Sequence, residues 1–138
     1  MPHTVSQFMT AHPTVVEVTD TLRAVAQTMA TQDVGALVVA ENGAVVGIVT
    51  DRDLVVRGLA EGIGLDAPVG RLATDELVSV GPDDAVAEVV QIMRDRAVRR
   101  VPVVQGDEAV GIVSIGDLAQ ALDSGSALAD ISAAPPND

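Results

Sequence analysis

The sequence predicts an α/β fold, or α+β in some schemes, made of two β-α-β-β-α units packed with pseudo-two-fold symmetry. Two observations support this prediction: a long internal repeat, and apolar residues whose spacing alternates between the helical and the strand period. The composition agrees with it. Hydrophobic residues make up 48% of the 138 residues and aromatic residues only 1%, so the core must consist of Val, Leu, Ile, Ala and Met. Small aliphatic side chains suit buried strands that are covered by helices.

The repeat is clearest where VVGIVTDRDL at residues 45–54 returns as AVGIVSIGDL at residues 109–118. Gly47 and Gly111 define a spacing of 111 − 47 = 64 residues. Other pairs that keep this spacing are Thr50 and Ser114, Asp53 and Asp117, Leu54 and Leu118, and Met29 and Met93. One copy alone would leave an apolar sheet face uncovered, so we expect the two copies to form a single domain. The expected boundaries are residues 1–64 for the first motif with its lead-in helix, 65–124 for the second motif, and 125–138 for a flexible acidic tail.

Each copy predicts the same elements in the same order. The expected strands are residues 15–18, 36–40 and 45–50 in the first copy, and 77–80, 101–104 and 109–114 in the second. The expected helices begin near Leu22 and at Asp51 in the first copy, and near Val86 and at Ile115 in the second. Asp20 and Asp83 stand where N-caps are expected. Asn42-Gly43 and Gly106-Asp107 are typical of tight hairpin turns.

The central helix of each copy has one apolar face. Apolar residues occur at i, i+3, i+4 and i+7 in both copies. They are Leu22, Val25, Ala26 and Met29 in the first copy, and Val86, Val89, Val90 and Met93 in the second. We expect these faces to cover the sheets.

The charge of the chain excludes several function classes. The formal net charge is −12, and all eight basic residues are arginine. Nucleic-acid affinity comes largely from basic side chains that displace counterions from phosphates, so we do not expect DNA or RNA binding. An anionic membrane surface is disfavoured for the same reason.

The sequence offers little for catalysis or metal binding. It has no cysteine, which excludes disulfides, cysteine-based zinc sites and thiol nucleophiles. His3 and His12 lie near the N-terminus, and no nucleophile–base arrangement can be placed, so we expect no enzyme and no metal site. No apolar run approaches the roughly 20 residues that span a bilayer, and no secretory segment is recognisable. We therefore expect a soluble cytoplasmic protein.

The repeated motif resembles that of CBS (cystathionine-β-synthase-type) domains. Both copies carry Gly, two hydrophobic residues, Thr or Ser, two variable residues and Asp, and the second copy adds Arg-Arg-Val-Pro-Val-Val at residues 99–104. The stretches VGALVV, TDRDLVVRGLAEG and VRRVPVV are similar to those of small stand-alone two-CBS proteins of the actinobacterial hypoxic-response type. The resemblance implies a Bateman-type module, a disc-like homodimer, and adenine-nucleotide binding in clefts between the repeats.

The resemblance also implies that Thr50 with Asp53, and Ser114 with Asp117, contact a ribose. A carboxylate can accept two hydrogen bonds from a ribose diol. The same spacing at a helix start is also that of a capping box, which needs no ligand. The two interpretations are compatible, because a side chain that caps the helix can also contact a ligand.

Phosphate recognition needs cations or helix N-termini, and four of the eight arginines fall between residues 94 and 100. Arg94 and Arg96 lie on the polar side of their helix and are expected to face solvent or form ion pairs. Arg99 and Arg100 precede a strand at positions where the family often carries a phosphate ligand. The alternative is a salt bridge between repeats or between protomers.

The two clefts are not expected to be equivalent, because the first copy has the uncharged Gly35 and Ala36 where the second has Arg99 and Arg100. In the family the signature of one repeat often faces the strand entry of the other. We therefore predict one cleft with Thr50 and Asp53 on the ribose and Arg99 and Arg100 on the phosphate.

The cleft at Ser114 and Asp117 is expected to be empty or to hold a neutral ligand. Adenine would sit in an aliphatic slot near Val16, Val78 and Pro102, which are also core positions. Arg52 is expected to be an exposed residue at a helix start.

The leading hypothesis is a regulatory module without a resident cofactor that binds AMP, ADP, ATP or a related adenosine ligand and forms a homodimer. The second hypothesis is an interaction or scaffold protein, with an unidentified protein partner, whose signature residues only cap helices. An unrecognised hydrolase or transferase is a third, weaker alternative.

Overall fold

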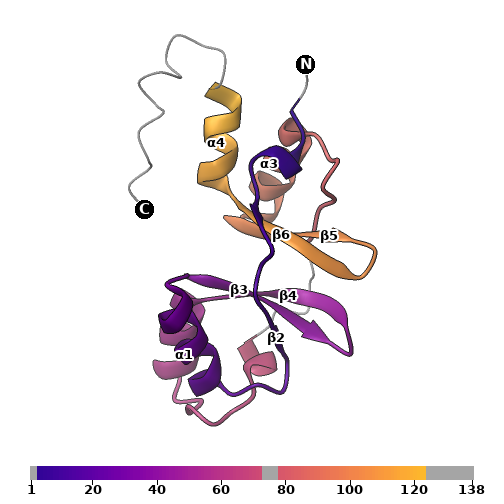
Figure 1. Cartoon of the computed structure of the whole chain (residues 1–138). Helices are drawn as coiled ribbons and strands as arrows, with labels where there is room; N and C mark the ends of the chain where they lie inside the picture. Colours follow the sequence, from indigo (N-terminus) through magenta and orange to yellow (C-terminus); the bar gives the residue numbers. More distant parts are fainter. Residues whose placement is uncertain (1–2, 73–77, 124–138) are drawn as a thin grey trace.

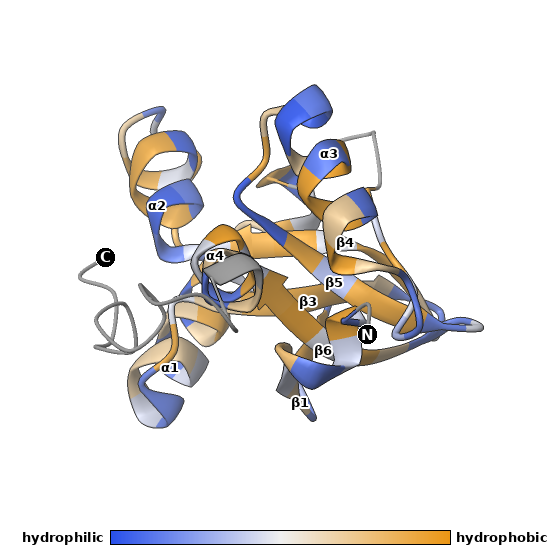
Figure 2. Ribbon diagram, turned by 90° about the horizontal axis from the view of Figure 1, so that it is seen from above, coloured by the Kyte–Doolittle hydropathy of each residue, from blue (hydrophilic) through white to orange (hydrophobic). Residues whose placement is uncertain are grey.

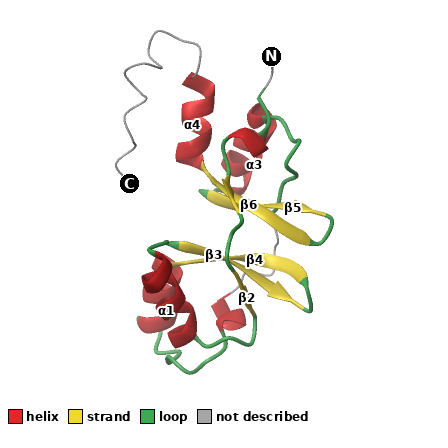
Figure 3. Ribbon diagram, viewed as in Figure 1, coloured by secondary structure: helices red, strands yellow, loops and turns green. Residues whose placement is uncertain are grey.

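A computed structural model of the chain describes residues 3–72 and 78–123. The two repeats form two halves, each with a sheet at the centre of the molecule and helices on its outer side (Figures 1 and 3). The first half contains β2 (Val15–Glu17), α1 (Leu22–Gln32), β3 (Ala36–Glu41), β4 (Ala44–Thr50) and α2 (Asp51–Asp53), which continues as the π-helical η2 (Leu54–Leu59). The second half contains α3 (Val86–Arg96), β5 (Arg100–Gln105), β6 (Glu108–Ser114) and α4 (Ile115–Asp123). The predicted order of elements and fold class are confirmed.

The sheet of each half is built on one long hairpin. In the first half the sheet order is β2-β3-β4, with β2 parallel and β4 antiparallel to β3. In the second half it is β1-β6-β5, where β1 (Thr10–Ala11) comes from the N-terminal segment. The strand predicted at residues 77–80 is reduced to a single parallel bridge between Val80 and Val103, and Leu77 lies outside the described residues.

The hairpin turns follow from the residues predicted for them. Asn42 and Gly43 both have a positive φ, 52° and 86°, as a type I′ turn requires. In the second hairpin only Gly106, with φ 66°, has this conformation. Glycine at the first central position of a two-residue turn is typical of type II′.

The predicted N-caps are wrong by one or two residues. α1 is capped by Thr21, whose Oγ1 accepts a hydrogen bond from the Ala24 N–H at 3.0 Å. The Asp20 carboxylate instead accepts the Glu17 N–H at 2.9 Å and closes the turn before the helix. Asp84 does the same with the Gly81 N–H at 2.8 Å, so α3 begins after Ala85 with no side-chain cap. Asp83 is exposed beside this turn. Local turn formation therefore uses Asp20, which the pattern assigned to capping, and Asp84, the neighbour of the predicted Asp83.

The lead-in segments are exchanged between the halves. The N-terminal 3-10 helix η1 (Val5–Gln7) lies beside α3, with hydrogen bonds of 3.0 Å from the Val5 N–H to Asp84 and from the Val86 N–H to His3 (Figure 1). In turn, residues before and within η3 (Val69–Leu72) bond to the first half. These bonds run from the Leu22 N–H to Ala67 at 3.0 Å and from the Val69 N–H to Asp20 at 2.7 Å. A boundary at residue 64 therefore separates the repeats but not two independent packing units.

Each half has its own core, and each core includes a lead-in residue from the other repeat. The second core contains Val5, and the first contains Val69 and Leu72. Figure 2 shows the strands predominantly in hydrophobic colours, with hydrophilic patches on the helices. On α3 all four predicted apolar residues are buried, but on α1 Ala26 is exposed, contrary to its prediction. None of the helices in residues 3–72 and 78–123 is long and apolar enough to cross a bilayer.

The two sheets also pack against each other. Leu37 and Val39 of β3 belong to the first core, whereas Val38, between them, is fully buried outside that cluster. Since successive strand residues face opposite sides, Val38 points toward the other sheet, as does its counterpart Pro102. The space between the halves is thus apolar at its centre, and any polar cleft must lie at its margin.

Candidate ligand clefts

Each long hairpin ends where a helix begins, and the residues at this junction form a capping box. Thr50 Oγ1 accepts a hydrogen bond from the Asp53 N–H at 3.1 Å, and the Thr50 N–H donates to Asp53 Oδ2 at 2.9 Å. Ser114 and Asp117 make the same two bonds at 3.1 and 3.0 Å. These reciprocal bonds satisfy backbone donors at the junction that would otherwise lack an intrahelical partner. The capping interpretation is therefore confirmed for both pairs.

Capping does not use the full bonding capacity of the two aspartates. In each capping box the carboxylate accepts one backbone hydrogen bond, through Oδ2. A carboxylate has about four lone-pair sites, so each aspartate can accept further hydrogen bonds. Both pairs are only partly buried, so a ligand can reach them. Recognition of a ribose diol is compatible with this geometry and stays a prediction.

A cleft of about 330 Å³ lies between the two halves. Its walls come from the segment that crosses from β1 to β2, from the end of α1 and the start of β3, and from the facing ends of β5 and β6. The lining residues are Thr10, His12, Pro13, Thr14, Gln32, Val34, Gly35, Ala36, Leu37, Arg100, Ile112, Ser114 and Asp117. We call this space the described cleft. Its size is within the range of small-molecule sites.

Three of the predicted site residues meet in the described cleft. Arg100 is the first residue of β5 and lies opposite Ser114 in the β5–β6 register. Both line the cleft together with Asp117. The structure thus brings Arg100 to the Ser114 and Asp117 pair, which sequence reasoning had treated as the less cationic site.

The predicted grouping of Thr50 and Asp53 with Arg99 and Arg100 corresponds to the pseudo-symmetric counterpart of this cleft. Each residue that lines the described cleft has an equivalent in the other repeat. The equivalents of Ser114 and Asp117 are Thr50 and Asp53, and the equivalent of Gly35 is Arg99. Strand β4, which carries Thr50, lies beside β5. The remaining wall would come from residues 73–77, which lie outside the described residues. This counterpart cleft therefore stays a prediction.

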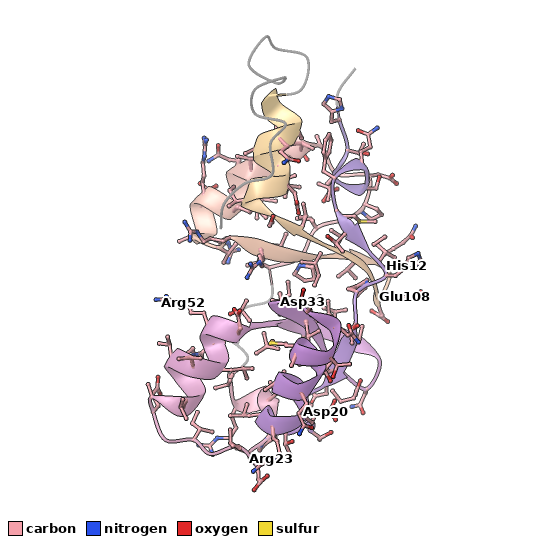
Figure 4. The ribbon with its side chains drawn as sticks, turned by 60° about the vertical axis from the view of Figure 1, so that its left-hand side comes forward. His12, Asp20, Arg23, Asp33, Arg52 and Glu108 are labelled. Carbon is pink, nitrogen blue, oxygen red and sulfur yellow. The ribbon has the colours of Figure 1, made fainter. Side chains whose placement is uncertain are left out.

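The other arginines singled out in the sequence are exposed. Arg94 and Arg96 lie on the outer face of α3, as expected. Arg52 follows the Thr50 cap at the start of α2, and Figure 4 shows its side chain extending away from the body of the molecule. The sequence interpretation of Arg52 as an exposed helix-start residue is consistent with this placement.

Sequence reasoning missed the polar wall supplied by the N-terminal crossing segment. Thr10, His12 and Thr14 line the described cleft, and Thr14 Oγ1 donates a hydrogen bond to Gln32 at the end of α1. The available signal was the three polar residues Thr10, His12 and Thr14 directly before β2. Its significance depends on the exchange of lead-in segments, which brings this run across both halves.

The predicted adenine slot has fewer available side chains than expected. The Val16 side chain is buried in the first core, and Val78 packs against the second. Pro102 is buried between the sheets, and its carbonyl oxygen accepts the Val80 N–H at 3.1 Å. Any contact with a base at these positions must therefore use the backbone around them.

A second, larger hollow of about 720 Å³ lies between the hairpin tips and has an acidic lining. Its charged residues include Glu17, Asp107 and Glu108, with His12 at its margin; Figure 4 shows His12 and Glu108 at the same edge of the molecule. Among the described residues, no group of three or more His, Asp or Glu side chains is placed to hold a metal ion. The hollow is therefore not assigned as a metal site.

Comparison with known proteins identifies the repeats. The family model described as CBS domain matches residues 5–58 and 69–124. The chain is 36% identical over 132 residues to the CBS domain-containing protein YhcV of Bacillus subtilis, an alignment that covers 93% of this chain and 94% of YhcV. It is 38% identical over 121 residues to Hypoxic response protein 1 of Mycobacterium tuberculosis, covering 86% of this chain and 85% of the relative.

Solved structures have the same architecture. The crystal structure of Hypoxic Response Protein I with two coordinated zinc ions has a TM-score of 0.76 at 37% identity, covering 86% of this chain and 98% of that one. A hexameric CBS-CP12 protein from bloom-forming cyanobacteria has a TM-score of 0.78 at 25% identity, covering 94% of this chain and 75% of that one. The family resemblance and the Bateman-type fold predicted from the sequence are confirmed.

Proposed function

This chain belongs to the CBS domain family, and from that premise we propose that it is a regulatory module that binds an adenine nucleotide or a related adenosine ligand between its repeats. The observation that carries the proposal is the placement of Asp117, Ser114 and Arg100 around one cleft whose other wall comes from the first repeat. A ligand held there would contact both halves. It would therefore favour the arrangement of the halves to which it binds more tightly.

The roles follow from the chemistry of each group. Asp117 accepts hydrogen bonds from the ribose diol, beside the hydroxyl of Ser114. Arg100 supplies positive charge and several N–H donors. In the counterpart cleft, Thr50 and Asp53 take the ribose, and Arg99 and Arg100 a phosphate.

Calorimetry and thermal shift with adenosine, AMP, ADP and ATP test this function. Asp117→Asn keeps an oxygen that can cap Ser114 but removes the charge and half of the acceptor capacity. We expect it to weaken ligand binding in the described cleft about tenfold, which corresponds to one charge-assisted hydrogen bond.

Glu88→Gln is the matched control, since it removes the same charge at an exposed position in the first turn of α3, in the same half. It should leave binding unchanged. Absence of binding by all four compounds at millimolar concentration would contradict the proposal.

An exposed apolar surface on η2 bears on the oligomeric state of this module. Val55, Val56 and Leu59 are 56%, 44% and 70% exposed. We propose that this surface is the contact of a homodimer. Burial of large aliphatic side chains against a second copy would contribute about 25 cal/mol per Å².

Sedimentation velocity tests the dimer. Leu59→Asp should produce a monomer, because it places a charge in the contact. Leu65→Asp changes another exposed leucine, 47% exposed, outside this surface and should leave the dimer intact. A dimer that survives Leu59→Asp would show that the contact lies elsewhere.

We propose no catalytic activity and no zinc site for this chain. The zinc ions belong to the structure of the tuberculosis relative. This chain has no cysteine, and its described residues hold no suitable ligand group. Turnover of ATP by the purified protein would contradict the proposed lack of catalytic activity.

A further inference from the structure

The two repeats differ in charge at a pair of contacting positions beside the proposed clefts. In the first half the pair is Gly35 and Asp51, and in the second it is Arg99 and Ile115. The backbone contact is the same in both. The Asp51 N–H donates to the Gly35 carbonyl oxygen at 3.0 Å, and the Ile115 N–H to that of Arg99 at 2.8 Å. The repeats therefore keep the geometry and reverse the charge.

The Asp51 carboxylate lies over Gly35. A Cβ atom built on Gly35 would be 3.2 Å from Asp51 Oδ2 and 3.7 Å from Oδ1. The carboxylate thus occupies the space that a side chain at position 35 would take. In the second half the arginine side chain has a partly buried isoleucine at the equivalent place.

This arrangement sets the charge of the described cleft. Gly35 lines the cleft, so the Asp51 carboxylate stands at its margin, while Asp117 and Arg100 are in its wall. The cleft and its margin therefore carry two carboxylates, of Asp117 and Asp51, and one guanidinium, of Arg100. A phosphate brought to the described cleft meets net repulsion, which Coulomb's law makes significant at distances of a few ångströms.

We infer that Asp51 is a specificity-determining residue, which makes the described cleft select an unphosphorylated adenosine ligand over its phosphates. This inference rests on the proposed function. It assigns a nucleoside without phosphate to the cleft at Ser114 and Asp117.

A helix-start role for Asp51 is separable from this one. Asp51 Oδ1 also accepts the Arg52 N–H at 2.8 Å. Asp51→Asn keeps an oxygen for that bond and removes the charge, whereas Asp51→Ile reproduces the second half. Because Asp51 is exposed, its effect on a phosphate must weaken as salt screens it.

The test is to titrate the protein with adenosine and, separately, with AMP. Two-dimensional NMR of the backbone amides monitors each titration. The amides of Gly35 and Asp117 report on the described cleft, and that of Asp53 on the counterpart. At low salt we expect wild-type protein to bind AMP about tenfold more weakly than adenosine at Gly35 and Asp117. Asp51→Asn and Asp51→Ile should bring this ratio to about two, mainly by strengthening AMP binding.

Glu61→Gln removes an exposed carboxylate elsewhere in the same half and should leave the ratio unchanged. Raising the salt from roughly 10 mM to roughly 1 M should reduce the wild-type ratio toward that of Asp51→Asn. A ratio that both Asp51 variants leave unchanged overturns this inference alone. Wild-type protein in which neither compound shifts Gly35 or Asp117 overturns the proposed function, and this inference with it.

Discussion

The two halves of the molecule have the same order of strands and helices, but among the described residues the two sheets are flanked by different segments. In the second half the N-terminal segment adds β1 beside β6 and brings Phe8 and Met9 against the core. The first half receives a short 3-10 helix from the linker but no corresponding strand among the described residues. Positions that are equivalent in sequence therefore have different surroundings, and the same substitution should have different effects in the two halves.

The largest difference is expected at the leucine that follows each signature aspartate. Leu118 is fully buried in the second core, whereas Leu54 only packs against the first. Leu118→Ala should lower the free energy of unfolding by about 2–5 kcal/mol, because it leaves a cavity in a closed core. Leu54→Ala should lower the free energy of unfolding clearly less, because Leu54 is only partly buried. Urea unfolding followed by far-UV circular dichroism measures both, and equal losses would contradict the comparison.

The next difference is expected at the signature glycines. A Cβ on Gly111 would overlap the Met9 side chain and lie 3.0 Å from the Thr10 carbonyl oxygen, whereas no atom of the described residues lies within 4 Å of one on Gly47. Gly111→Ala should therefore cost about 1–3 kcal/mol of stability through overpacking. Gly47→Ala should change it by less than about 0.5 kcal/mol.

A double-mutant cycle identifies the cause of the Gly111 effect. If Met9 is the obstacle, Gly111→Ala and Met9→Ala together should cost less than the sum of the two single changes. Strict additivity would show that the clash is with the backbone of β1 instead.

The smallest difference is expected at the helix N-caps. Thr21→Ala removes the bond to the Ala24 N–H and should cost about 0.5–2 kcal/mol. Ala85→Ser offers the missing cap to α3 and should stabilise the protein by about 0.5–1 kcal/mol. Thr19→Ala, a change of the same type at an exposed turn residue, is the control and should be nearly neutral in thermal unfolding.

Features that depend on neighbouring residues could be predicted from the sequence. The hairpin at Asn42-Gly43 and the capping boxes at Thr50 and Ser114 depend on local backbone chemistry, which the residue types specify. The N-cap of α1 was misplaced because Asp20 can bond to a turn or to a helix, and the sequence does not show which it prefers. At α3 the prediction named Asp83, but its neighbour Asp84 closes the turn and Ala85 stands at the N-cap.

Features that depend on distant residues could not be predicted. The crossing of Val5 and β1 to the second half is set by packing and by backbone bonds to Asp84 and Ile112, which leave no periodic pattern. For the same reason the polar wall formed by Thr10 and Thr14 was missed. The grouping of Arg100 with Ser114 follows from the β5–β6 register, which the hairpin turn fixes and which sequence reasoning had not used.

The exchanged lead-in segments also constrain how the chain is made. During synthesis on a ribosome, His3 and Val5 emerge long before their hydrogen-bond partners, Val86 and Asp84. Residues 65–72, which complete the first half, emerge well after β4. The first half can therefore close only once residues 69–72 have emerged, and the second only when α3, β5 and β6 meet an N-terminal segment that was made long before them. Contacts between segments so distant in sequence slow folding, since a long loop must close before any of them forms.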